Sequence, residues 1–471
     1  MKLAQLAKKQ VVVLGYGREG QATARVLAQY KTATDVSVWV ESGGLGESGD
    51  SASHTELGAS VISRPFDDGL CEFDIAIRSP GIPVSHPALI AFQQAGGEVV
   101  NPSSIFFSER PDAKVIGVTG SKGKSTTSSV LAHLINQSSQ SAVLAGNIGR
   151  PLVGLLDPTV TSSAERSADL VVAELSSYQL CDLVGELTLS LITRLFPEHI
   201  DWHGSVESYY AAKMRMFDLT QNQAVLVNAR DPILMAEVES RPAAIPVNLW
   251  PERAGPAPHR ENADIWAEGQ VWLRESDWSL AGRHNLDNAV MALSALAYLG
   301  IEPQPLAPTL SRFKPLAHRL ERLDGPKGIG WINDSIATTP HATKAALEAL
   351  EGQAIVLIVG GHERGGDWSV VIEHLKDWPL AGLVALPDNG ATIIETLASD
   401  HALDQCAVAL AENMTQAVAC AHEMAMTERD RSGHEVAVLL SPGAPSFGHF
   451  QNFEQRGEAF ARAIETLGSD H

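Results

Sequence analysis

The feature that most constrains the fold of this 471-residue chain is the stretch Val115–Thr127, which reads V-I-G-V-T-G-S-K-G-K-S-T-T. An apolar run predicts a short buried strand, and a turn with Gly120 and Gly123 leads into a helical pattern that continues to Ile135. A strand, a glycine turn and a helix start bind phosphate, because backbone N–H groups and the positive end of the helix dipole face the anion. We therefore expect an α/β unit with a phosphate site.

Two side chains of this loop suit a nucleotide. Lys124 would place a charge on the β- and γ-phosphates, and the Ser125 hydroxyl would bind Mg²⁺. The usual P-loop pattern has glycine where this chain has Val118, so T-G-x-x-G-K-S-T describes the loop better. An ordinary glycine turn with a surface lysine is the alternative, but the strand before it and the helix after it favour phosphate binding.

Composition limits the class of protein. The length suggests about three domains, and 44% hydrophobic with 19% charged residues is typical of globular proteins with sizeable cores. The net charge of −21 disfavours nucleic acid and anionic membranes as partners. The four cysteines have no C-x-x-C spacing, no segment is apolar enough to span a bilayer, and the N-terminus is too polar for a secretory signal. We expect a multidomain cytoplasmic enzyme without a membrane anchor.

The N-terminal region contains a second glycine motif. Val11–Gly20 predicts a strand followed by G-x-G-x-x-G, a helix follows over Gln21–Gln29, and a second strand, Val36–Val40, runs into Glu41. NAD binding with Glu41 on a ribose is one hypothesis, but the same turn holds other diphosphates. With a further strand over Phe73–Arg78, residues 1–110 predict a Rossmann-like domain that binds a diphosphate-bearing molecule.

Candidate metal ligands follow the phosphate loop. Glu174 ends the predicted strand Leu170–Glu174, and ligands bind beyond the carboxyl ends of strands in such sheets, so it is placed like a Mg²⁺ ligand. His199 comes after a later strand end; a packing role is the alternative to a ligand role. Lys213 lies in the middle of a helix predicted over Val206–Leu219, where a lysine is normally solvated surface.

A proline-dense stretch, 303–315, predicts a domain boundary. After it, strands alternate with helices, which predicts a second doubly wound α/β domain. The loops after Asn333, Gly360 and Ser441 fall at the carboxyl ends of strands, so we expect them to share one crevice.

In combination these motifs resemble the Mur ligases of peptidoglycan synthesis, and within them the ligases that add glutamate to UDP-N-acetylmuramoyl-L-alanine. The resemblance spans essentially the whole chain and implies three α/β domains: residues 1–110 for the UDP-sugar, 111–315 for ATP and 316–471 for the amino acid. The segments that carry it are Thr119–Thr126, Gly146–Gly149, Glu174–Gln179, His284–Asn285, His318–Arg319, Asn333–Ser335 and Asn452–Gly457.

The resemblance implies that ATP phosphorylates the substrate carboxylate and that the incoming amine displaces phosphate from the acyl phosphate. It implies two Mg²⁺ ions held by Ser125, Glu174, His199 and Lys213, with Lys213 carbamylated, and it makes Lys124, Glu174, His199 and Lys213 the catalytic residues. The implied ATP contacts are Gly120, Ser121, Lys122, Gly123, Lys124, Ser125, Thr126, Asn285, Asn288, Arg319 and Asp334. The implied UDP-substrate contacts are Gly15, Tyr16, Ser79, Asn147 and Gln179. The family's arginine near the uracil is replaced by Glu41-Ser42, which leaves that contact open.

The amino-acid site departs most from the family. Ile336 replaces a lysine, Arg364 replaces the glutamate-binding lysine, and a proline and Phe447 flank Ser446. The implied glutamate contacts are Thr338, Arg364, Ser446, Phe447 and Phe453. Because the changes are confined to this pocket, we favour the branch that adds L-glutamate over one that adds D-glutamate.

Other hypotheses stay open. A diaminopimelate- or lysine-adding ligase and a folylpolyglutamate synthase fit the N-terminal domain and Asn452–Gly457 less well. A nucleotide-binding regulatory protein without ligase activity is the alternative from another class. We expect a monomer.

Overall fold

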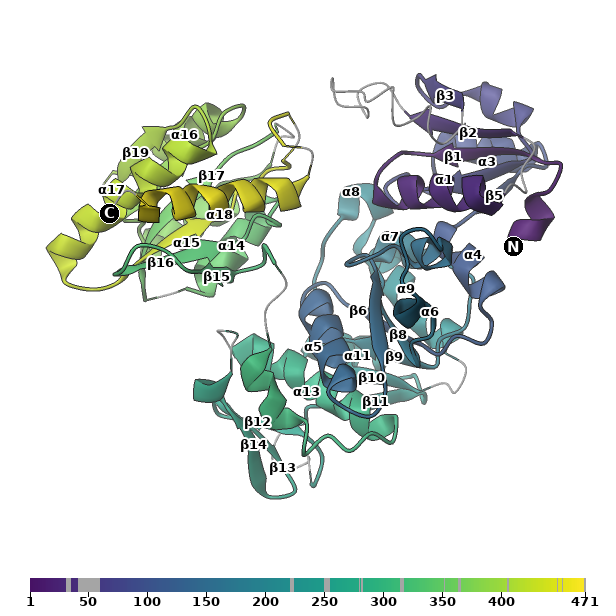
Figure 1. Ribbon diagram of the computed structural model, residues 1–471, viewed down its shortest axis with the longest axis horizontal. Coiled ribbons are helices and arrows are strands. Elements are labelled where there is room, and N and C mark those ends of the chain that lie inside the picture. Colours follow the sequence, from purple (N-terminus) through teal and green to yellow (C-terminus); the bar gives the residue numbers. More distant parts are fainter. Residues whose placement is uncertain are drawn as a thin grey trace. The chain divides into compact units, whose positions relative to one another are not determined.

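The computed structural model describes residues 1–30, 35–40, 60–220, 224–249, 255–278, 280, 283–313, 317–350, 352–362, 366–404, 406–446, 448–450 and 452–469. This part of the chain divides into two compact units, Met1–Phe313 and Lys314–His471. Both consist of helices around mainly parallel sheets (Figure 1), which confirms the α/β class. The three predicted domain limits stay a prediction. No helix among the described residues has the length and apolar composition needed to cross a membrane.

The first sheet has the strand order β3-β2-β1-β4-β5, and all its described pairings are parallel. Its strands are β1 (Gln10–Leu14), β2 (Asp35–Val40), β3 (Ser60–Ser63), β4 (Ile75–Arg78) and β5 (Glu98–Val100). Its helices are α1 (Arg18–Tyr30), α3 (Pro87–Gln94) and α4 (Pro102–Glu109). This is the predicted Rossmann-like arrangement, with the glycine turn between β1 and α1.

The second sheet, β11-β10-β9-β6-β8-β7, is also parallel and has the phosphate-loop strand in its interior. Its strands are β6 (Val115–Thr119), β7 (Ala142–Gly146), β8 (Leu170–Glu174), β9 (Leu189–Ile192), β10 (Val225–Asn228) and β11 (Ala244–Val247). Two apolar helices, α5 (Lys124–Asn136) and α13 (Arg283–Tyr298), share one core with it. The shorter helices are α6 (Ser163–Arg166), α7 (Ser177–Leu180), α8 (Ile200–His203) and α11 (Pro232–Val238).

Two details differ from the sequence prediction. The helix expected over Val206–Leu219 is two helices, α9 (Val206–Met214) and α10 (Met216–Leu219), so Lys213 lies in the last turn of α9 rather than mid-helix. An antiparallel sheet of β12 (His259–Glu261), β13 (Asp264–Ala267) and β14 (Gln270–Arg274) was not predicted. The 3-10 helices are η1 (Leu3–Leu6), η2 (Asp68–Glu72), η3 (Leu152–Leu156), η4 (Glu275–Asp277) and η5 (Ala307–Arg312).

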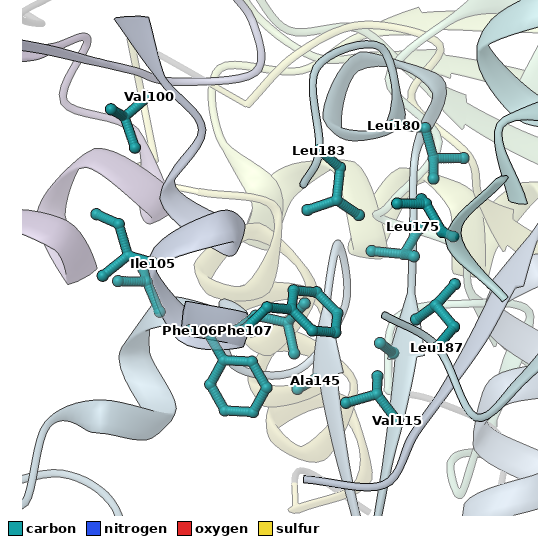
Figure 2. Packing of buried hydrophobic residues seen from close by; sticks show 14 of the residues in the cluster. Val100, Ile105, Phe106, Phe107, Val115, Ala145, Leu175, Leu180, Leu183 and Leu187 are labelled. Atoms are coloured by element: carbon teal, nitrogen blue, oxygen red, sulfur yellow. The ribbon is translucent and has the colours of Figure 1, made fainter. Parts of the chain in front are cut away.

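The first two sheets belong to one unit because they share a hydrophobic core. That core joins Val11 and Val13 of β1 to Val115 of β6 and Leu175 after β8. Figure 2 shows its middle, where the aromatic side chains of α4 lie among aliphatic side chains of the second sheet and the segment after α7. The N-terminal domain is therefore packed directly against the phosphate-loop domain.

The C-terminal unit has the strand order β15-β16-β20-β17-β18-β19, with β15 antiparallel and the other strands parallel. Its strands are β15 (Glu321–Leu323), β16 (Ile329–Asn333), β17 (Ala354–Val359), β18 (Gly382–Ala385), β19 (Ala407–Leu410) and β20 (Val436–Leu440). Its helices are α14 (Pro340–Glu348), α15 (Ser369–Asp377), α16 (Gly390–Ser399), α17 (Met414–Ser432) and α18 (Phe453–Ser469). The Ser441 hydroxyl donates to Asp334, and the Gly360 N–H donates to the Pro442 carbonyl. The three loops expected to share a crevice therefore do meet.

Candidate active site

Neighbouring side chains approach the phosphate loop between β6 and α5 closely from two sides. Gly120 has φ +148°, and a Cβ there would lie 2.1 Å from Thr193 Oγ1. Gly123 has φ +86°, and a Cβ there would lie 2.3 Å from Asn288 Oδ1. Side chains other than hydrogen would collide at both positions, so the loop needs its glycines to fit against β9 and α13.

The loop's polar side chains are ordered by the loop itself. Lys124 Nζ donates to the Ser121 carbonyl at 2.8 Å, and Thr193 Oγ1 donates to the Lys122 carbonyl at 2.6 Å. Ser125 is buried in the first turn of α5, followed by Thr126. Backbone donors, a lysine and a hydroxyl thus meet at the start of a 13-residue helix, which suits nucleotide phosphates.

Two predicted ATP contacts from a distant part of the sequence lie at this loop. Asn285 and Asn288 are buried in the first turns of α13, and Asn288 Nδ2 donates to Asn285 Oδ1 at 3.3 Å. Asn288 faces Gly123, so the structure brings these amides to the phosphate loop.

Glu174, at the end of β8, has two carboxylate oxygens in different surroundings. Oε1 accepts a hydrogen bond from Asn147 Nδ2 at 2.8 Å. Oε2 is buried and has no hydrogen-bond partner among the described residues. A buried carboxylate oxygen without a donor suits a cation, so the residue fits the predicted Mg²⁺ ligand.

Lys213 is fully buried beside the phosphate loop. Its Nζ donates to the Gly120 carbonyl at 2.7 Å and lies 4.6 Å from the centre of the Tyr209 ring. The Tyr209 hydroxyl is 2.8 Å from Ser121 Oγ, so Tyr209 links the lysine to the loop. Burial, followed by the nearby Lys124 cation, lowers the Lys213 pKa well below its usual value of 10.5. A neutral amine is the form that reacts with CO₂, so the surroundings fit the predicted carbamylation.

His199 has a left-handed backbone, with φ +57°, at the start of α8. His199 is exposed to solvent, yet the protein packed around its ring lowers the pKa of the imidazole. The Glu198 carboxylate raises this pKa, and the Lys213 cation lowers it further. A neutral imidazole is the metal-binding form. Within the described ranges, however, no three His, Cys, Asp or Glu side chains are grouped closely enough to hold a metal. Two-metal binding therefore stays a prediction.

The predicted UDP-substrate contacts come together between the first two sheets. Ser79 Oγ donates to the Gly15 carbonyl at 3.2 Å, next to Tyr16. Arg18, in the same glycine turn, donates to the carbonyls of Asn147 and Gly149. The turn therefore contacts the loop that carries Asn147.

Glu19 is a functional candidate that sequence reasoning missed, because the glycine fingerprint leaves its position unspecified. Its Oε1 accepts a hydrogen bond from Gln179 Nε2, and its Oε2 is buried with no described partner. Burial raises the Glu19 pKa to about 7. The Gln179 side-chain oxygen already accepts from Ser176, so this structure engages both ends of the Gln179 amide.

Several predicted contacts lie in the C-terminal unit. Asp334 accepts from the Leu320 N–H and from Ser441 Oγ, and the buried Nε of neighbouring Arg319 has no partner among the described residues. Ser446 is buried, Phe453 is half-buried and Thr338 is exposed. Arg364, Phe447, and Glu41 of the N-terminal domain lie outside the described residues.

Comparisons with known proteins agree with this arrangement. The model of the Mur ligase middle domain matches residues 118–296, and the model described as "Mur ligase, glutamate ligase domain" matches residues 318–470. The chain is 35% identical to UDP-N-acetylmuramoyl-L-alanine--L-glutamate ligase of Micromonospora sp., covering 99% of both chains. It is 34% identical to the protein of that name in Salinispora tropica, covering 99% of this chain and 100% of the relative.

Among solved structures, the chain is similar to the UDP-N-acetylmuramate-alanine ligase of Thermotoga maritima. The TM-score is 0.57 at 18% identity, covering 98% of this chain and 100% of the other, so this likeness concerns the fold alone. The matching models, the full-length relatives and the site geometry lead to one conclusion: the chain belongs to the Mur ligase family, whose three-domain architecture it shares.

Proposed function

We propose that this protein is an ATP-dependent ligase that joins L-glutamate to UDP-N-acetylmuramoyl-L-alanine in peptidoglycan synthesis. The observation that carries the proposal is full-length similarity to relatives named for this reaction, together with the intact phosphate loop, Glu174 and Lys213.

The phosphate-loop side chains have defined roles in this proposal. Lys124 and the loop's N–H groups bind the ATP phosphates, and Asn285 and Asn288 line the loop from α13. Little covalent chemistry is left to the protein when a phosphoryl group is transferred, so fixed charge and orientation provide most of the acceleration. Arg319 and Asp334 are further proposed ATP contacts.

Ser125, Glu174, His199 and Lys213 are the proposed holders of Mg²⁺. When bound, the ions would neutralise charge on the phosphate oxygens. Asn147 keeps Glu174 Oε1 occupied and so leaves the buried Oε2 for a cation. Carbamylation of Lys213 would replace a buried amine by an anionic oxygen ligand, and the lowered Lys213 pKa supports that chemistry.

The first domain is proposed to bind the UDP-sugar, with Gly15, Tyr16, Ser79, Asn147 and Gln179 as contacts. The proposed glutamate contacts are Thr338, Arg364, Ser446, Phe447 and Phe453. The protein is proposed to work in the cytoplasm as a monomer.

The test uses purified protein with UDP-N-acetylmuramoyl-L-alanine, ATP, Mg²⁺ and either glutamate enantiomer, and it measures phosphate release and the product mass. We expect product with L-glutamate, and none from a K124A variant. Faster turnover with D-glutamate would replace the L-specific proposal. No substrate-stimulated phosphate release with either enantiomer would favour a nucleotide-binding regulatory protein instead.

A further inference from the structure

Helix α8 connects two of the proposed sites. It begins directly after His199, one of the proposed Mg²⁺ ligands, and its Trp202 side chain reaches the first domain. The indole Nε1–H donates a hydrogen bond to the Gly81 carbonyl at 3.1 Å. Gly81 lies in the turn after β4, two residues beyond Ser79, a proposed UDP-substrate contact. One side chain therefore joins the turn of the first site to the helix of the second.

The turn that Trp202 contacts is stiff. The Ile82 N–H donates to the Ser79 carbonyl at 3.1 Å, which closes the turn. The ring of Pro80 fixes one of the backbone dihedral angles inside it. Gly81 and Ser79 therefore move together, so a ligand that fixes Ser79 also fixes the carbonyl that accepts from the Trp202 indole.

His199 has a backbone conformation that its surroundings must maintain. Its φ of +57° and ψ of +33° lie in the left-handed region, which is unfavourable for a residue with a Cβ. Such a conformation persists only where the surrounding structure enforces it. The N–H groups of Trp202 and His203 both donate to the His199 carbonyl, at 3.2 and 3.1 Å. The position of α8 therefore determines the position of His199.

Helix α7 holds α8 from another side. The Trp202 ring centre lies 4.6 Å from that of Tyr178, and the Tyr178 ring also lies 5.0 Å from the His199 ring. His203 Nε2 lies 2.9 Å from Ser177 Oγ. Aromatic rings at these separations attract one another. The first domain therefore acts on α8 through the Trp202 indole, while α7 acts on it through ring packing and the His203 side chain.

We propose that Trp202 is a positioning residue that couples the UDP-substrate site to His199. The proposal rests on the ligase activity proposed above. Substrate bound at Ser79 fixes the turn, the turn fixes α8 through the indole, and α8 holds His199 in its left-handed conformation. A ligand that orders a shared element lowers the ordering cost for the next ligand, so UDP-substrate and nucleotide strengthen each other's binding.

The test measures the dissociation constant of UDP-N-acetylmuramoyl-L-alanine by calorimetry, without and with a non-hydrolysable ATP analogue and Mg²⁺. The ratio of the two constants is the coupling factor between the sites. We expect a coupling factor above about five in wild-type protein, and we expect W202F to lower it about fivefold, the equivalent of one hydrogen bond. Phenylalanine keeps an aromatic ring beside Tyr178 but lacks the indole N–H.

The matched control is W272F. Trp272 is half-buried on β14, and its indole N–H has no hydrogen-bond partner among the residues that the structure describes. The same chemical change there removes no described hydrogen bond, so W272F should keep the wild-type coupling factor. An equal loss of coupling in W272F and W202F would overturn the proposal, because the loss would not depend on the contact with Gly81.

A second readout separates positioning from general damage to the fold. W202F should bind the UDP-substrate alone with wild-type affinity, because Trp202 acts on the coupling and not on the first site itself. W202L repeats the test with a side chain that also lacks the ring, and a wild-type coupling factor in either folded variant would overturn the proposal. No turnover by wild-type protein with either glutamate enantiomer would instead refute the ligase function on which the proposal rests.

Discussion

At the residue scale, the orientation of Glu174 depends on Asn147. The Asn147 amide holds Oε1 at 2.8 Å and leaves the buried Oε2 without a described partner. Removing a group that orients a metal ligand typically lowers the affinity for the metal by roughly 10–100-fold. We therefore predict that N147A raises the Mg²⁺ concentration needed for half-maximal activity by about that factor, measured by Mg²⁺ titration at saturating substrates.

The control for this prediction is Q179A, a change at another proposed UDP-substrate contact that has no bond to Glu174. Q179A should raise KM for the UDP-substrate without moving the Mg²⁺ dependence. Equal Mg²⁺ dependence in N147A and wild-type protein would show that Asn147 does not orient the ligand.

Glu19 provides a pH-dependent prediction. Burial raises its pKa from the usual 4.5 to about 7, so the folded protein binds this proton more tightly than the unfolded chain. The protonated Glu19 carboxyl therefore stabilises the folded protein fully below about pH 4.5, and this stabilisation is lost as pH rises through about 7. Arg78, Arg18 and Asp182 also act on this carboxyl, but less than burial does.

We predict that E19Q, which stays neutral at every pH, is more stable than wild-type protein above pH 7 and of similar stability near pH 4.5. Thermal unfolding across this range measures the difference, in which the other titrating groups cancel. A Tm difference that does not change with pH would contradict the raised pKa.

These residues also mark what sequence could predict. Lys124, Ser125 and Glu174 follow from their places at strand ends and helix starts. Lys213 does not, because burial in the last turn of α9 is a tertiary property; its role came only from family resemblance. Glu19 went unnoticed because its hydrogen-bond partner, Gln179, lies 160 positions along the chain.

At the element scale, the phosphate loop is fixed by close packing of β6, α5 and α13. We predict that G123A lowers ligase activity by roughly 10²-fold. The alanine would have to adopt the left-handed backbone φ of +86°, and its Cβ would overlap the Asn288 side chain. Steady-state kinetics and binding of a non-hydrolysable ATP analogue measure the effect.

The matched control is G300A, just after α13. Gly300 has a similar φ of +73°, but nothing lies within 4 Å of a Cβ placed there. G300A should therefore show the backbone strain alone, about 1–2 kcal/mol of stability, with ATP binding kept. If both variants bind the analogue like wild-type protein, the contact with Asn288 is not important for the site.

Whole elements were predicted best where the pattern was continuously apolar, as for β6 and β8. The helix over Val206–Leu219 was predicted as continuous, because its composition gives no sign of the break at Arg215. The β12–β14 sheet was missed: its strands are short, and such strands depend on packing more than on local propensity.

At the scale of the molecule, residues 1–313 behave as one unit because a shared core and a buried ion pair join the first two sheets. Arg78, 0% exposed at the end of β4, donates to both carboxylate oxygens of Asp182, at 3.0 and 2.7 Å. Asn101 Nδ2 donates to the same carboxylate at 2.6 Å. Sequence could predict each sheet, but not this pair, whose members are 104 positions apart.

We predict that R78M destabilises this unit strongly, because it keeps the side-chain volume but leaves Asp182 without its cation. Breaking a buried pair costs about 3–5 kcal/mol, and the lower end applies because Asp182 is 24% exposed. Urea unfolding followed by hydrogen exchange should show protection falling together in β4 and β8.

The double variant R78M/D182N should recover part of the loss, since it removes the unpaired charge. E458Q, which breaks the exposed Arg462–Glu458 pair, should change nothing measurable. If R78M weakened protection in β4 alone, the two sheets would unfold separately and the shared core would not couple them.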